Sequence, residues 1–377
     1  MRVVFFFMTE GGADAKNIPS WNPRAEGHSK YLENGGLVSE GLYWMLKKMK
    51  KEGIIQDLLL VIESSRNTGS FVLQGNQGYV VPHISCIDPF LKKDDVLFVR
   101  GGFRGWHDWL KSKKGKHWLL LYAANTGRER WPWWDVVLDD IRPEARKDEA
   151  GRIWWPFNKP INGDFFFLIP DAKPSFDVCI GASYIHDKKG QWRAIRAINE
   201  YQKIYGRAPK CIMPGAVRSS TETVKALQIA RRLGIKEPGM VPRSDLNMIL
   251  NTSKIFIHLG TSGQNDRGPL EALKCGCQLI IGSPKYHSPV VTDRKVCEVP
   301  ENKDDFVEVA NLIYSYLKTY KAESRKVRSD WYVRTTEMPL MYDMNRLFYR
   351  LRNLPPSYTV WKTIWRKDGY EVTRGYL

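Results

Sequence analysis

The sequence predicts an α/β protein of two lobes, each a mainly parallel sheet covered by helices. Short apolar runs rich in β-branched or aromatic residues alternate with longer segments of helical period, which is typical of βαβ units. A length of 377 residues is enough for two domains. The alternation starts again after residues 170–174, where two prolines flank polar residues. We therefore expect an N-terminal lobe over 1–170, a second lobe over 171–330, and C-terminal helices over 331–377 that return to the first lobe.

The first lobe is expected to begin with a βαβ unit. Gly35 and Gly36 precede an amphipathic helix whose apolar residues run from Leu37 to Leu46 and whose other face is rich in lysine. The apolar runs predict strands over residues 3–7, 58–62, 96–99, 119–122 and 165–169. Residues 128–163 are rich in Trp and Pro, and their pattern predicts neither helix nor strand.

The second lobe has a more regular pattern. Its apolar runs predict strands over residues 178–180, 211–213, 254–259 and 278–281. A helix is predicted to start near Gly190, and another to run from an N-cap at Ser220 to a stop at Gly234. Two more are predicted from an N-cap at Ser244 and with Pro269 in the first turn.

The composition excludes a disordered, collagenous or membrane-spanning chain. Apolar residues are 43% and charged residues 26%, as in globular proteins. No apolar stretch approaches the roughly 18 residues that cross a bilayer, and the initial apolar run is shorter than the core of a signal peptide. Six scattered cysteines indicate a reducing compartment, so we expect a cytoplasmic protein, in the host cytoplasm if it is viral. Cys275 and Cys277 lack a second pair at zinc spacing and are expected to be buried structural residues, with no metal.

One segment of the second lobe has the features of a phosphate site. A predicted strand leads into residues 260–263, whose glycines allow close backbone approach, and a helix with free amides begins near Pro269. Glu271 could accept hydrogen bonds from ribose hydroxyls, while the amides and Arg267 take the charge of a diphosphate. The pattern is equally compatible with an ordinary turn between a strand and a helix.

Three motifs in chain order resemble the donor lobe of family 4-like glycosyltransferases. Residues 259–281 contain the Glu-Ala-x-x-Cys-Gly-Cys run, residues 239–250 resemble the segment before it, and residues 180–190 resemble the strand, glycine and Lys-Gly that begin the lobe. The resemblance implies a GT-B fold of two Rossmann-like doubly wound lobes facing a cleft. It also implies retaining sugar transfer from a UDP- or GDP-type donor. The chain contains no Asp-x-Asp metal signature, so we expect a metal-independent site that requires no cofactor.

Site residues follow from the resemblance position by position. Glu271 would hold the donor ribose and Lys189 would neutralise the departing diphosphate, so these two are the expected catalytic residues. The expected donor-binding residues are Gly181, Ser183, Lys189, Gly260, Thr261, Ser262, Gly263, Arg267 and Glu271.

The chain departs from the family pattern at two positions. Gly263 stands where the family often has an acid, and Ala182-Ser183 stands where it has an arginine. The missing positive charge could come from Arg193, Arg218, Arg243 or Arg267, which the sequence does not rank. The departures are also compatible with a weak or inactive enzyme. If the reaction inverts configuration, it needs a base in the first lobe, for which His107, Asp14 and Glu10 are candidates by residue type.

The net charge of +17 favours a polyanionic acceptor. In the first lobe, residues 100–134 combine eight Lys and Arg with six tryptophans, a composition used to bind and stack nucleic-acid bases. The expected acceptor-binding residues are Gly35, Gly36, Arg100, Arg104, Trp106 and His107. A modified base in viral DNA is the acceptor that we favour.

Other interpretations of the same charge remain open. The tryptophans could lie in the core beneath a solvated lysine-rich surface. The basic residues could contact an anionic membrane, and the acceptor could be lipid-linked or a polysaccharide. A protein that binds nucleic acid but has lost catalysis would also combine high positive charge with the two departures.

Overall fold

The chain divides into two compact units. Unit 1 consists of Met1–Pro160 and Leu340–Leu377, and unit 2 of Ile161–Pro339. The computed structural model describes residues 1–7, 41–63, 68–100, 104–122, 130–139, 146–148, 152–181, 184–185, 187–217, 221–260, 267–282, 296–353, 362–366 and 369–373.

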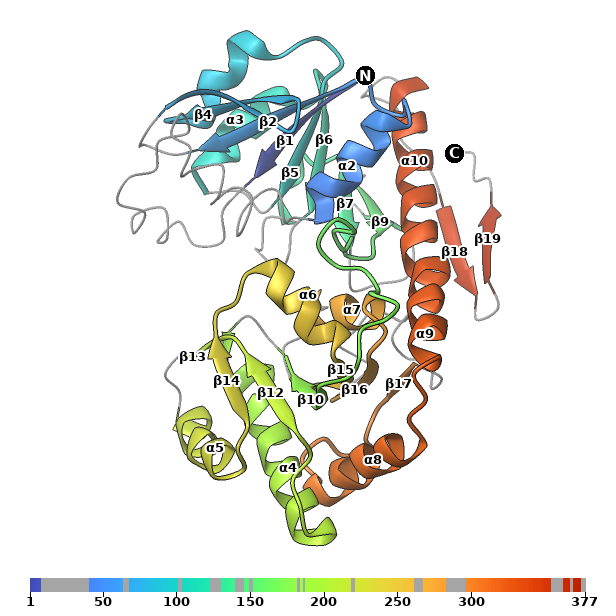
Figure 1. The fold of residues 1–377 in the computed structure, drawn as a ribbon. Coiled ribbons are helices and arrows are strands. Elements are labelled where there is room, and N and C mark those ends of the chain that lie inside the picture. Colours follow the sequence, from blue (N-terminus) through green and yellow to red (C-terminus); the bar gives the residue numbers. More distant parts are fainter. Residues whose placement is uncertain are drawn as a thin grey trace. The chain divides into compact units, whose positions relative to one another are not determined.

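Unit 1 is built on a nine-stranded sheet in the order β3-β4-β2-β1-β5-β6-β7-β9-β8. Its strands are β1 (Arg2–Phe7), β2 (Asp57–Glu63), β3 (Gly69–Leu73), β4 (Asn76–Val81), β5 (Val96–Arg100), β6 (Trp118–Tyr122), β7 (Val136–Asp139), β8 (Arg146–Lys147) and β9 (Ile153–Pro156). The strands from β4 to β9 in this order pair in parallel, whereas β3 and β8 are antiparallel edges. The chain runs from β1 to one side of the sheet and from β5 to the other (Figure 1).

Helices and 3₁₀ turns complete unit 1. They are α2 (Gly41–Lys51), η2 (Ile84–Phe90), η3 (Arg104–Trp106), α3 (His107–Lys113) and α10 (Met338–Asn353), with a separate hairpin of β18 (Lys362–Arg366) and β19 (Gly369–Thr373). Alternate strand residues such as Val4 and Phe6 pack on one face with Trp106 and Leu110. The indole nitrogen of Trp118 donates to the carbonyl of Leu351, which fixes the end of α10 to this unit.

Unit 2 contains an entirely parallel six-stranded sheet in the order β14-β12-β10-β15-β16-β17. Its strands are β10 (Phe176–Ile180), β12 (Cys211–Pro214), β14 (Lys236–Gly239), β15 (Ser253–His258), β16 (Gln278–Ile281) and β17 (Cys297–Glu298), with a small pair of β11 (Tyr184–Ile185) and β13 (Ala216–Val217). Renumbered from one, the large sheet has the order 3-2-1-4-5-6 of a dinucleotide-binding Rossmann fold.

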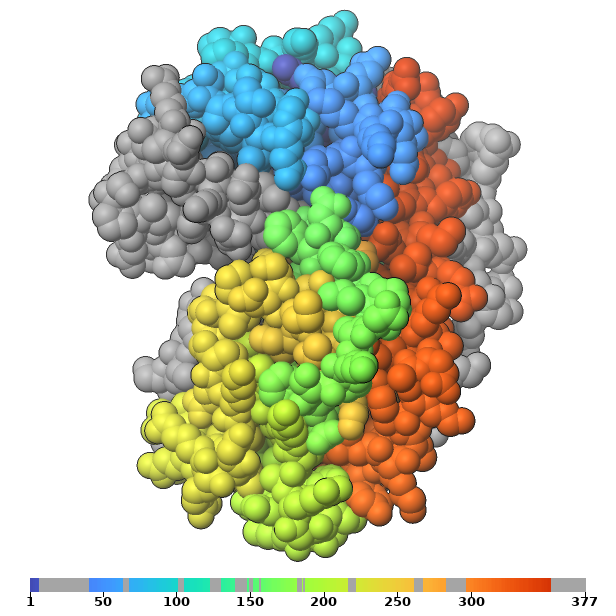
Figure 2. Space-filling model, in the orientation of Figure 1, coloured from blue at the N-terminus to red at the C-terminus, as the bar shows by residue number. Residues whose placement is uncertain are grey.

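Helices cover both faces of this sheet. They are η5 (Asp187–Lys189), α4 (Gln191–Tyr205), α5 (Thr221–Arg232), α6 (Arg243–Asn251), α7 (Arg267–Lys274), α8 (Phe306–Thr319), α9 (Ser324–Tyr332) and η8 (Val333–Glu337). Ile255 and Ile257 pack with α4, α5 and α8, whereas Phe256 between them packs with α6, α7 and α9. Figure 2 shows α4 and α8 side by side at the surface. This arrangement confirms the expected doubly wound α/β fold.

The prediction of a strand over 165–169 is wrong. These residues form turns and irregular backbone, although Phe166 is buried. The Phe167 amide donates to Asn247 Oδ1 and the Ile169 amide to Asn251 Oδ1, so side chains of α6 replace the strand partner.

Two other local predictions are modified. The uninterpreted region 128–163 contains the short strands β7, β8 and β9. The helix expected from Ser244 begins instead at Arg243, with Pro242 at the N-cap. Within the described helices, none combines the length and apolar character needed to cross a membrane.

Candidate donor site and acceptor residues

The candidate ligand site of unit 2 lies at the carboxyl ends of the neighbouring strands β10 and β15, and this edge of the sheet is called the donor edge below. From these two strands the chain proceeds to opposite sides of the sheet. Ligands of open α/β sheets bind at the carboxyl ends of the strands at such a point, because the flanking loops separate there. Gly181 directly follows β10, and Leu259 and Gly260 directly follow β15. Two predicted donor-binding glycines therefore share this edge.

The turn that carries Lys189 packs directly on the end of β15. Gly190 has φ +75°, and a Cβ added to it would lie 2.2 Å from the carbonyl oxygen of Leu259. A Cβ on Gly260 would lie 3.1 and 3.2 Å from the carbonyl oxygens of Lys188 and Lys189. Glycine is required at position 190, where a Cβ would overlap the backbone of Leu259, and a Cβ at position 260 would be crowded by the same turn. The structure thus brings together two of the motifs that the sequence places about 70 residues apart.

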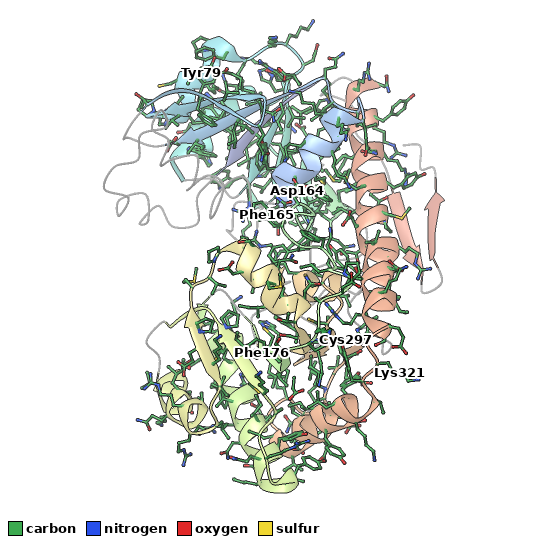
Figure 3. All side chains as sticks on the ribbon, viewed as in Figure 1. Tyr79, Asp164, Phe165, Phe176, Cys297 and Lys321 are labelled. Atoms are coloured by element: carbon green, nitrogen blue, oxygen red, sulfur yellow. The ribbon has the colours of Figure 1, made fainter. Side chains whose placement is uncertain are left out.

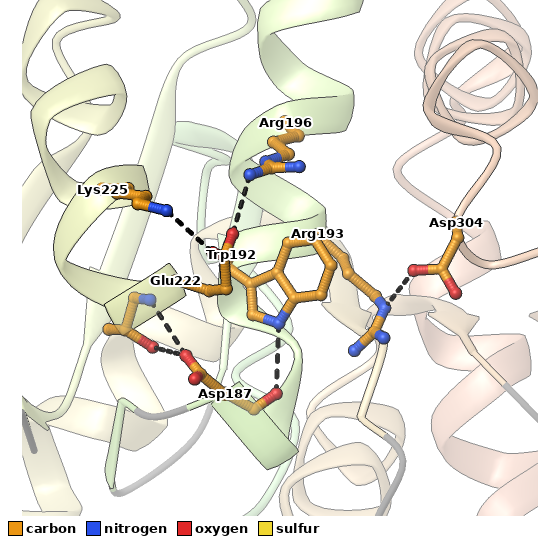
Figure 4. A network of polar contacts seen from close by, with 8 residues as sticks. Asp187, Trp192, Arg193, Arg196, Glu222, Lys225 and Asp304 are labelled. Atoms are coloured by element: carbon orange, nitrogen blue, oxygen red, sulfur yellow. Dashed lines mark hydrogen bonds and ion pairs between the residues drawn. The ribbon is translucent and has the colours of Figure 1, made fainter. Parts of the chain in front are cut away.

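Asp187 anchors the same turn to α5 (Figure 4). One carboxylate oxygen accepts hydrogen bonds from the Thr223 amide at 2.9 Å and from the Thr223 hydroxyl at 2.7 Å. The Asp187 carbonyl accepts a hydrogen bond from the Trp192 indole at 3.2 Å. The backbone of Lys189 is therefore held between the first turns of α4 and α5 and the end of β15.

Glu271 lies on α7 and is only 6% exposed. Its Oε1 is 3.5 Å from Nη1 of Arg243, the first residue of α6. The guanidinium of Arg243 also lies over the ring of Phe166. Arg243 is one of the four arginines that the sequence offered, and the structure places its charge beside Glu271.

Two glycines of the site have a packing role of their own. A Cβ on Gly181 would lie 1.9 Å from the Phe256 ring, and one on Gly268 would lie 3.2 Å from it. The Phe256 side chain therefore fills the space between the end of β10 and the first turn of α7. Close approach of α7 to the strand ends follows from this packing and needs no ligand.

The other three candidate arginines differ in position: Arg193 lies on α4, Arg267 begins the helix that carries Glu271, and Arg218 is not described. Arg193 pairs with Asp304 at 2.5 Å and stacks on Trp192 at 4.2 Å (Figure 4). Arg267 begins α7 and is half-buried. The candidates that fall outside the described residues are Ser183, Arg218, Thr261, Ser262, Gly263, Gly35, Gly36, Glu10 and Asp14.

In unit 1, Arg100 occupies the corresponding edge of the larger sheet. It ends β5, and its backbone is paired with that of Phe7 at the end of β1, where the strand order diverges. Its side chain is buried. The backbone of Arg104 follows in η3, but its side chain is outside the described residues. The Arg100 position is therefore the unit 1 counterpart of the Gly181 and Gly260 edge.

Trp106 is a core residue, whereas His107 is partly exposed. The indole ring of Trp106 is 1% exposed, and its nitrogen donates to Glu63 Oε2 at 2.6 Å. The ring centroids of His107 and Trp133 lie 4.1 Å apart with nearly perpendicular planes, and Nδ1 of His107 lies 2.8 Å from Asp108 Oδ1. Four further tryptophans of the basic segment are also buried, namely Trp109, Trp118, Trp133 and Trp134. These buried rings offer no face to a nucleic-acid base.

Sequence reasoning missed His258 and Glu63. His258 ends β15 and is buried, with Nδ1 3.4 Å from the carbonyl oxygen of Gly181. Glu63 ends β2 and accepts hydrogen bonds from the Ile84 amide and the Trp106 indole. Both are polar residues at the carboxyl end of an otherwise apolar strand, a signal that the sequence contains.

The Cys275 and Cys277 thiols are buried and free. Cys275 donates to Asn247 Oδ1 and Cys277 to the carbonyl oxygen of Leu250. Burial raises the pKa of the Cys277 thiol to about 12, so it stays protonated at neutral pH. Among the described residues, no group of three or more His, Cys, Asp or Glu could hold a metal ion.

The two sheets and the edge between β10 and β15 define a fold of the GT-B glycosyltransferase class. An Escherichia coli trehalose-6-phosphate protein bound with UDP-2-fluoro glucose superposes with a TM-score of 0.60 at 9% identity, covering 94% of this chain and 99% of that one. Sucrose-phosphate synthase from Thermosynechococcus elongatus has a TM-score of 0.60 at 11% identity, covering 93% and 99% of the two chains. The pneumococcal O-GlcNAc transferase GtfA in complex with UDP and GlcNAc has a TM-score of 0.55 at 11% identity, covering 76% and 65%. No protein-family model and no curated protein matches the sequence.

Proposed function

We propose that the protein is a glycosyltransferase that moves a sugar from a nucleoside diphosphate sugar to an acceptor hydroxyl. The observation that carries the proposal is the packing of the Lys189 turn on Gly260, at the strand ends where a Rossmann-type sheet binds its ligand. Of three structures with the same fold, one is described as bound with UDP-2-fluoro glucose, one as a sucrose-phosphate synthase and one as in complex with UDP and GlcNAc. A UDP- or GDP-type donor is therefore the ligand class that we assign to this edge.

The donor-side residues have distinct tasks in this proposal. Lys189 neutralises the negative charge that grows on the departing diphosphate as the bond from the sugar to the phosphate breaks. Glu271 accepts hydrogen bonds from the ribose hydroxyls, and Arg243 orients the Glu271 carboxylate through their ion pair. Catalysis retains the configuration of the sugar and requires neither a metal nor another cofactor. NMR of the first-formed product anomer tests the stereochemistry, and activity in excess EDTA tests the metal requirement.

The acceptor that we propose is polyanionic, with a modified base of DNA as its favoured form. The support for this is the net charge of +17 and the position of Arg100 at the diverging edge of the unit 1 sheet. Because Trp106 is buried, recognition would rest on charge and on the partly exposed His107 rather than on stacked tryptophans. Binding to DNA should then weaken steeply as salt is raised.

The test of the donor site is release of nucleoside diphosphate from a panel of UDP- and GDP-sugars by the full chain. Lys189→Ala should reduce the rate at least about 100-fold, since it removes charge stabilisation in the transition state. Lys188→Ala is the matched control, because Lys188 is the exposed neighbour in the same turn and should retain near-normal turnover. Equal loss in both variants, or no release from any donor, would contradict the proposal.

Acceptor assays then separate the alternatives. Transfer of labelled sugar to DNA containing hydroxymethylated bases supports the favoured acceptor. Transfer to a lipid-linked sugar or to a polysaccharide, and not to DNA, would identify that molecule as the acceptor instead. Salt-sensitive DNA binding without any donor turnover would instead identify a protein that binds nucleic acid and has lost catalysis.

A further inference from the structure

The strand β3 forms one edge of the unit 1 sheet. Within the described residues it pairs on one side alone, with β4. The two strands are joined by Gln74 and Gly75, whose φ angles of +48° and +76° match those of a two-residue type I′ turn. Such a turn makes Leu73 the first residue to exchange hydrogen bonds with β4, and residues of this kind then alternate along the strand. The amides and carbonyls of Ser70 and Val72 therefore point to the open edge.

Packing on one face of the sheet fixes the orientation of β3. Phe71 and Leu73 are buried, and a Cβ added to Gly78, which is paired with Phe71, would lie 2.2 Å from the Phe71 ring. Successive side chains of a strand point to opposite faces, so Ser70 and Val72 point outward, and Val72 is 69% exposed. A slip of one residue would expose Phe71 and Leu73. The register of β3 is therefore fixed by the core.

The other three edges of the two large sheets have features that oppose pairing with a further strand. β8 is only Arg146–Lys147, β17 is only Cys297–Glu298, and β14 contains charged residues and a proline. Short length, charge and proline are the usual protection of a sheet edge. β3 has five residues without charge or proline, and residues 68–82 contain no Asp, Glu, Lys or Arg, although 26% of the chain is charged. Among the described edges of these two sheets, β3 is the one that lacks such protection.

An apolar patch adjoins this edge. Ser70 is paired with Tyr79, so Val72 and Tyr79 are diagonal neighbours on the same face of the sheet. The ring centroids of Tyr79 and Phe90 are 4.3 Å apart, and Phe90 is 42% exposed. Figure 3 labels Tyr79 on β4. We call the β3 backbone together with Val72, Tyr79 and Phe90 the edge surface.

We infer that the edge surface binds the edge surface of a second copy of this chain, with the two β3 strands antiparallel about a two-fold axis at Phe71. In that register Ser70 of one copy stands opposite Val72 of the other, and each such pair exchanges two N–H to O=C hydrogen bonds. All the outward backbone groups of Ser70 and Val72 are then paired. The same surface is used on both copies, so the assembly closes as a dimer. A strand without charge suits copies of net charge +17, because it brings no like charges together.

Sedimentation equilibrium of the full chain, from low micromolar to near-millimolar concentration, measures the association. We expect a reversible equilibrium between monomer and dimer, because a contact of one strand and three side chains is small. Val72→Lys should raise the dissociation constant of the dimer at least about tenfold, because each copy would bring a cation into the contact. Val327→Lys is the matched control and should associate as the wild type does, because Val327 on α9 is 63% exposed and lies outside the edge surface.

Disulfide cross-linking tests the register. The variants Ser70→Cys and Val72→Cys are made in a Cys86→Ser background, which removes an exposed thiol, and are treated with oxidised glutathione separately and as a mixture. Opposite residues of a hydrogen-bonded pair have Cα atoms about 5.5 Å apart, within disulfide reach. The two copies of Val72 would be offset by two residues along the strands, which puts their Cα atoms beyond about 7 Å. The mixture should therefore form a disulfide dimer, and each variant alone should form little.

A wild-type chain that stays monomeric over the whole concentration range would overturn the inference. So would a dimer that Val72→Lys and Val327→Lys weaken equally, or association that continues beyond the dimer. Cross-linking of either cysteine variant alone as fast as in the mixture would contradict the register. Both lysine variants replace an exposed side chain, so their melting temperatures should stay near that of the wild type.

Discussion

Arg243 on α6 and Glu271 on α7 form an ion pair, although the two residues lie 28 positions apart in the sequence. The side chain of Glu271 is buried, so removing Arg243 leaves a carboxylate away from water without this cation. We expect Arg243→Met to lower the free energy of unfolding by about 1–3 kcal/mol in urea titrations at pH 7. Arg231→Met is the control, because Arg231 is largely exposed and lies 3.9 Å from Glu237, and its loss should cost less than about 0.5 kcal/mol.

The double variant Arg243→Met with Glu271→Gln completes this test. A neutral amide is less costly to bury than an unpaired carboxylate, so the double variant should be more stable than the sum of the single effects predicts. Strict additivity would show that the two side chains do not interact.

Helix α4 has a glycine at each end, and comparing variants of these two glycines distinguishes the cost of backbone strain from the cost of a steric clash. Gly190 and Gly206 have nearly the same conformation, φ +75° and +79°, but a Cβ on Gly206 would meet nothing within 4 Å. Gly206→Ala should cost about 1 kcal/mol from left-handed strain alone. Gly190→Ala should cost about 3 kcal/mol or more, because its Cβ would also collide with the Leu259 carbonyl.

Donor binding provides a second measurement on these variants. Gly190→Ala displaces the Lys189 turn from the end of β15 and should abolish the thermal shift by the nucleotide sugar. Gly206→Ala should leave that shift intact. If both variants unfold at the same denaturant concentration, the close packing of the Lys189 turn is not a feature of the protein.

Helix α10 carries a buried carboxyl that makes stability depend on pH. Burial raises the pKa of Asp343 to about 6. The Arg346 guanidinium, 3.8 Å away, lowers this pKa but offsets only part of the effect of burial. The folded state therefore binds a proton more tightly than the unfolded state, and this carboxyl makes stability fall as pH rises from about 4 to about 6.

The amide variant Asp343→Asn should remove that fall. At pH 7 it should be more stable than the wild type by about 2 kcal/mol, and the two should converge near pH 4. Asp330→Asn on α9, where the side chain is exposed, should keep the wild-type slope. Urea unfolding at several pH values measures these differences, and a constant offset between Asp343→Asn and the wild type would refute the assignment.

Across the whole molecule, the sequence predicted the strands and helices that follow from local residue patterns. It missed the structure of segments that depend on contacts with residues far away in the sequence. The strands β10, β12, β15 and β16 of unit 2 and the start of α4 at Gly190 follow from apolar runs and one glycine, whereas β14 and β17 were not predicted. The strand predicted at 165–169 failed because the amides of that segment find Asn247 and Asn251, 80 or more residues away. An apolar run alone carries no information about such a partner.

The candidate site divides in the same way. The glycines of the donor edge could be found because tight turns restrict residue type. The arginine beside Glu271 could not be chosen, since the pairing of α6 with α7 is a tertiary contact. Basic and aromatic composition likewise did not distinguish exposed rings from the buried Trp106. The same applies to charge, because Arg325 and Arg328 contribute to the net +17 but lie in the core of unit 2.

Hydrogen exchange of the full chain, with and without a UDP- or GDP-sugar that it hydrolyses, locates the nucleotide directly. We expect the donor to slow exchange in peptides covering residues 187–195 and 267–274, and to leave peptides from the α8 to α9 turn unchanged. Protection that is confined to unit 1, or absent from both unit 2 peptides at saturating donor, would contradict a nucleotide site at the ends of β10 and β15.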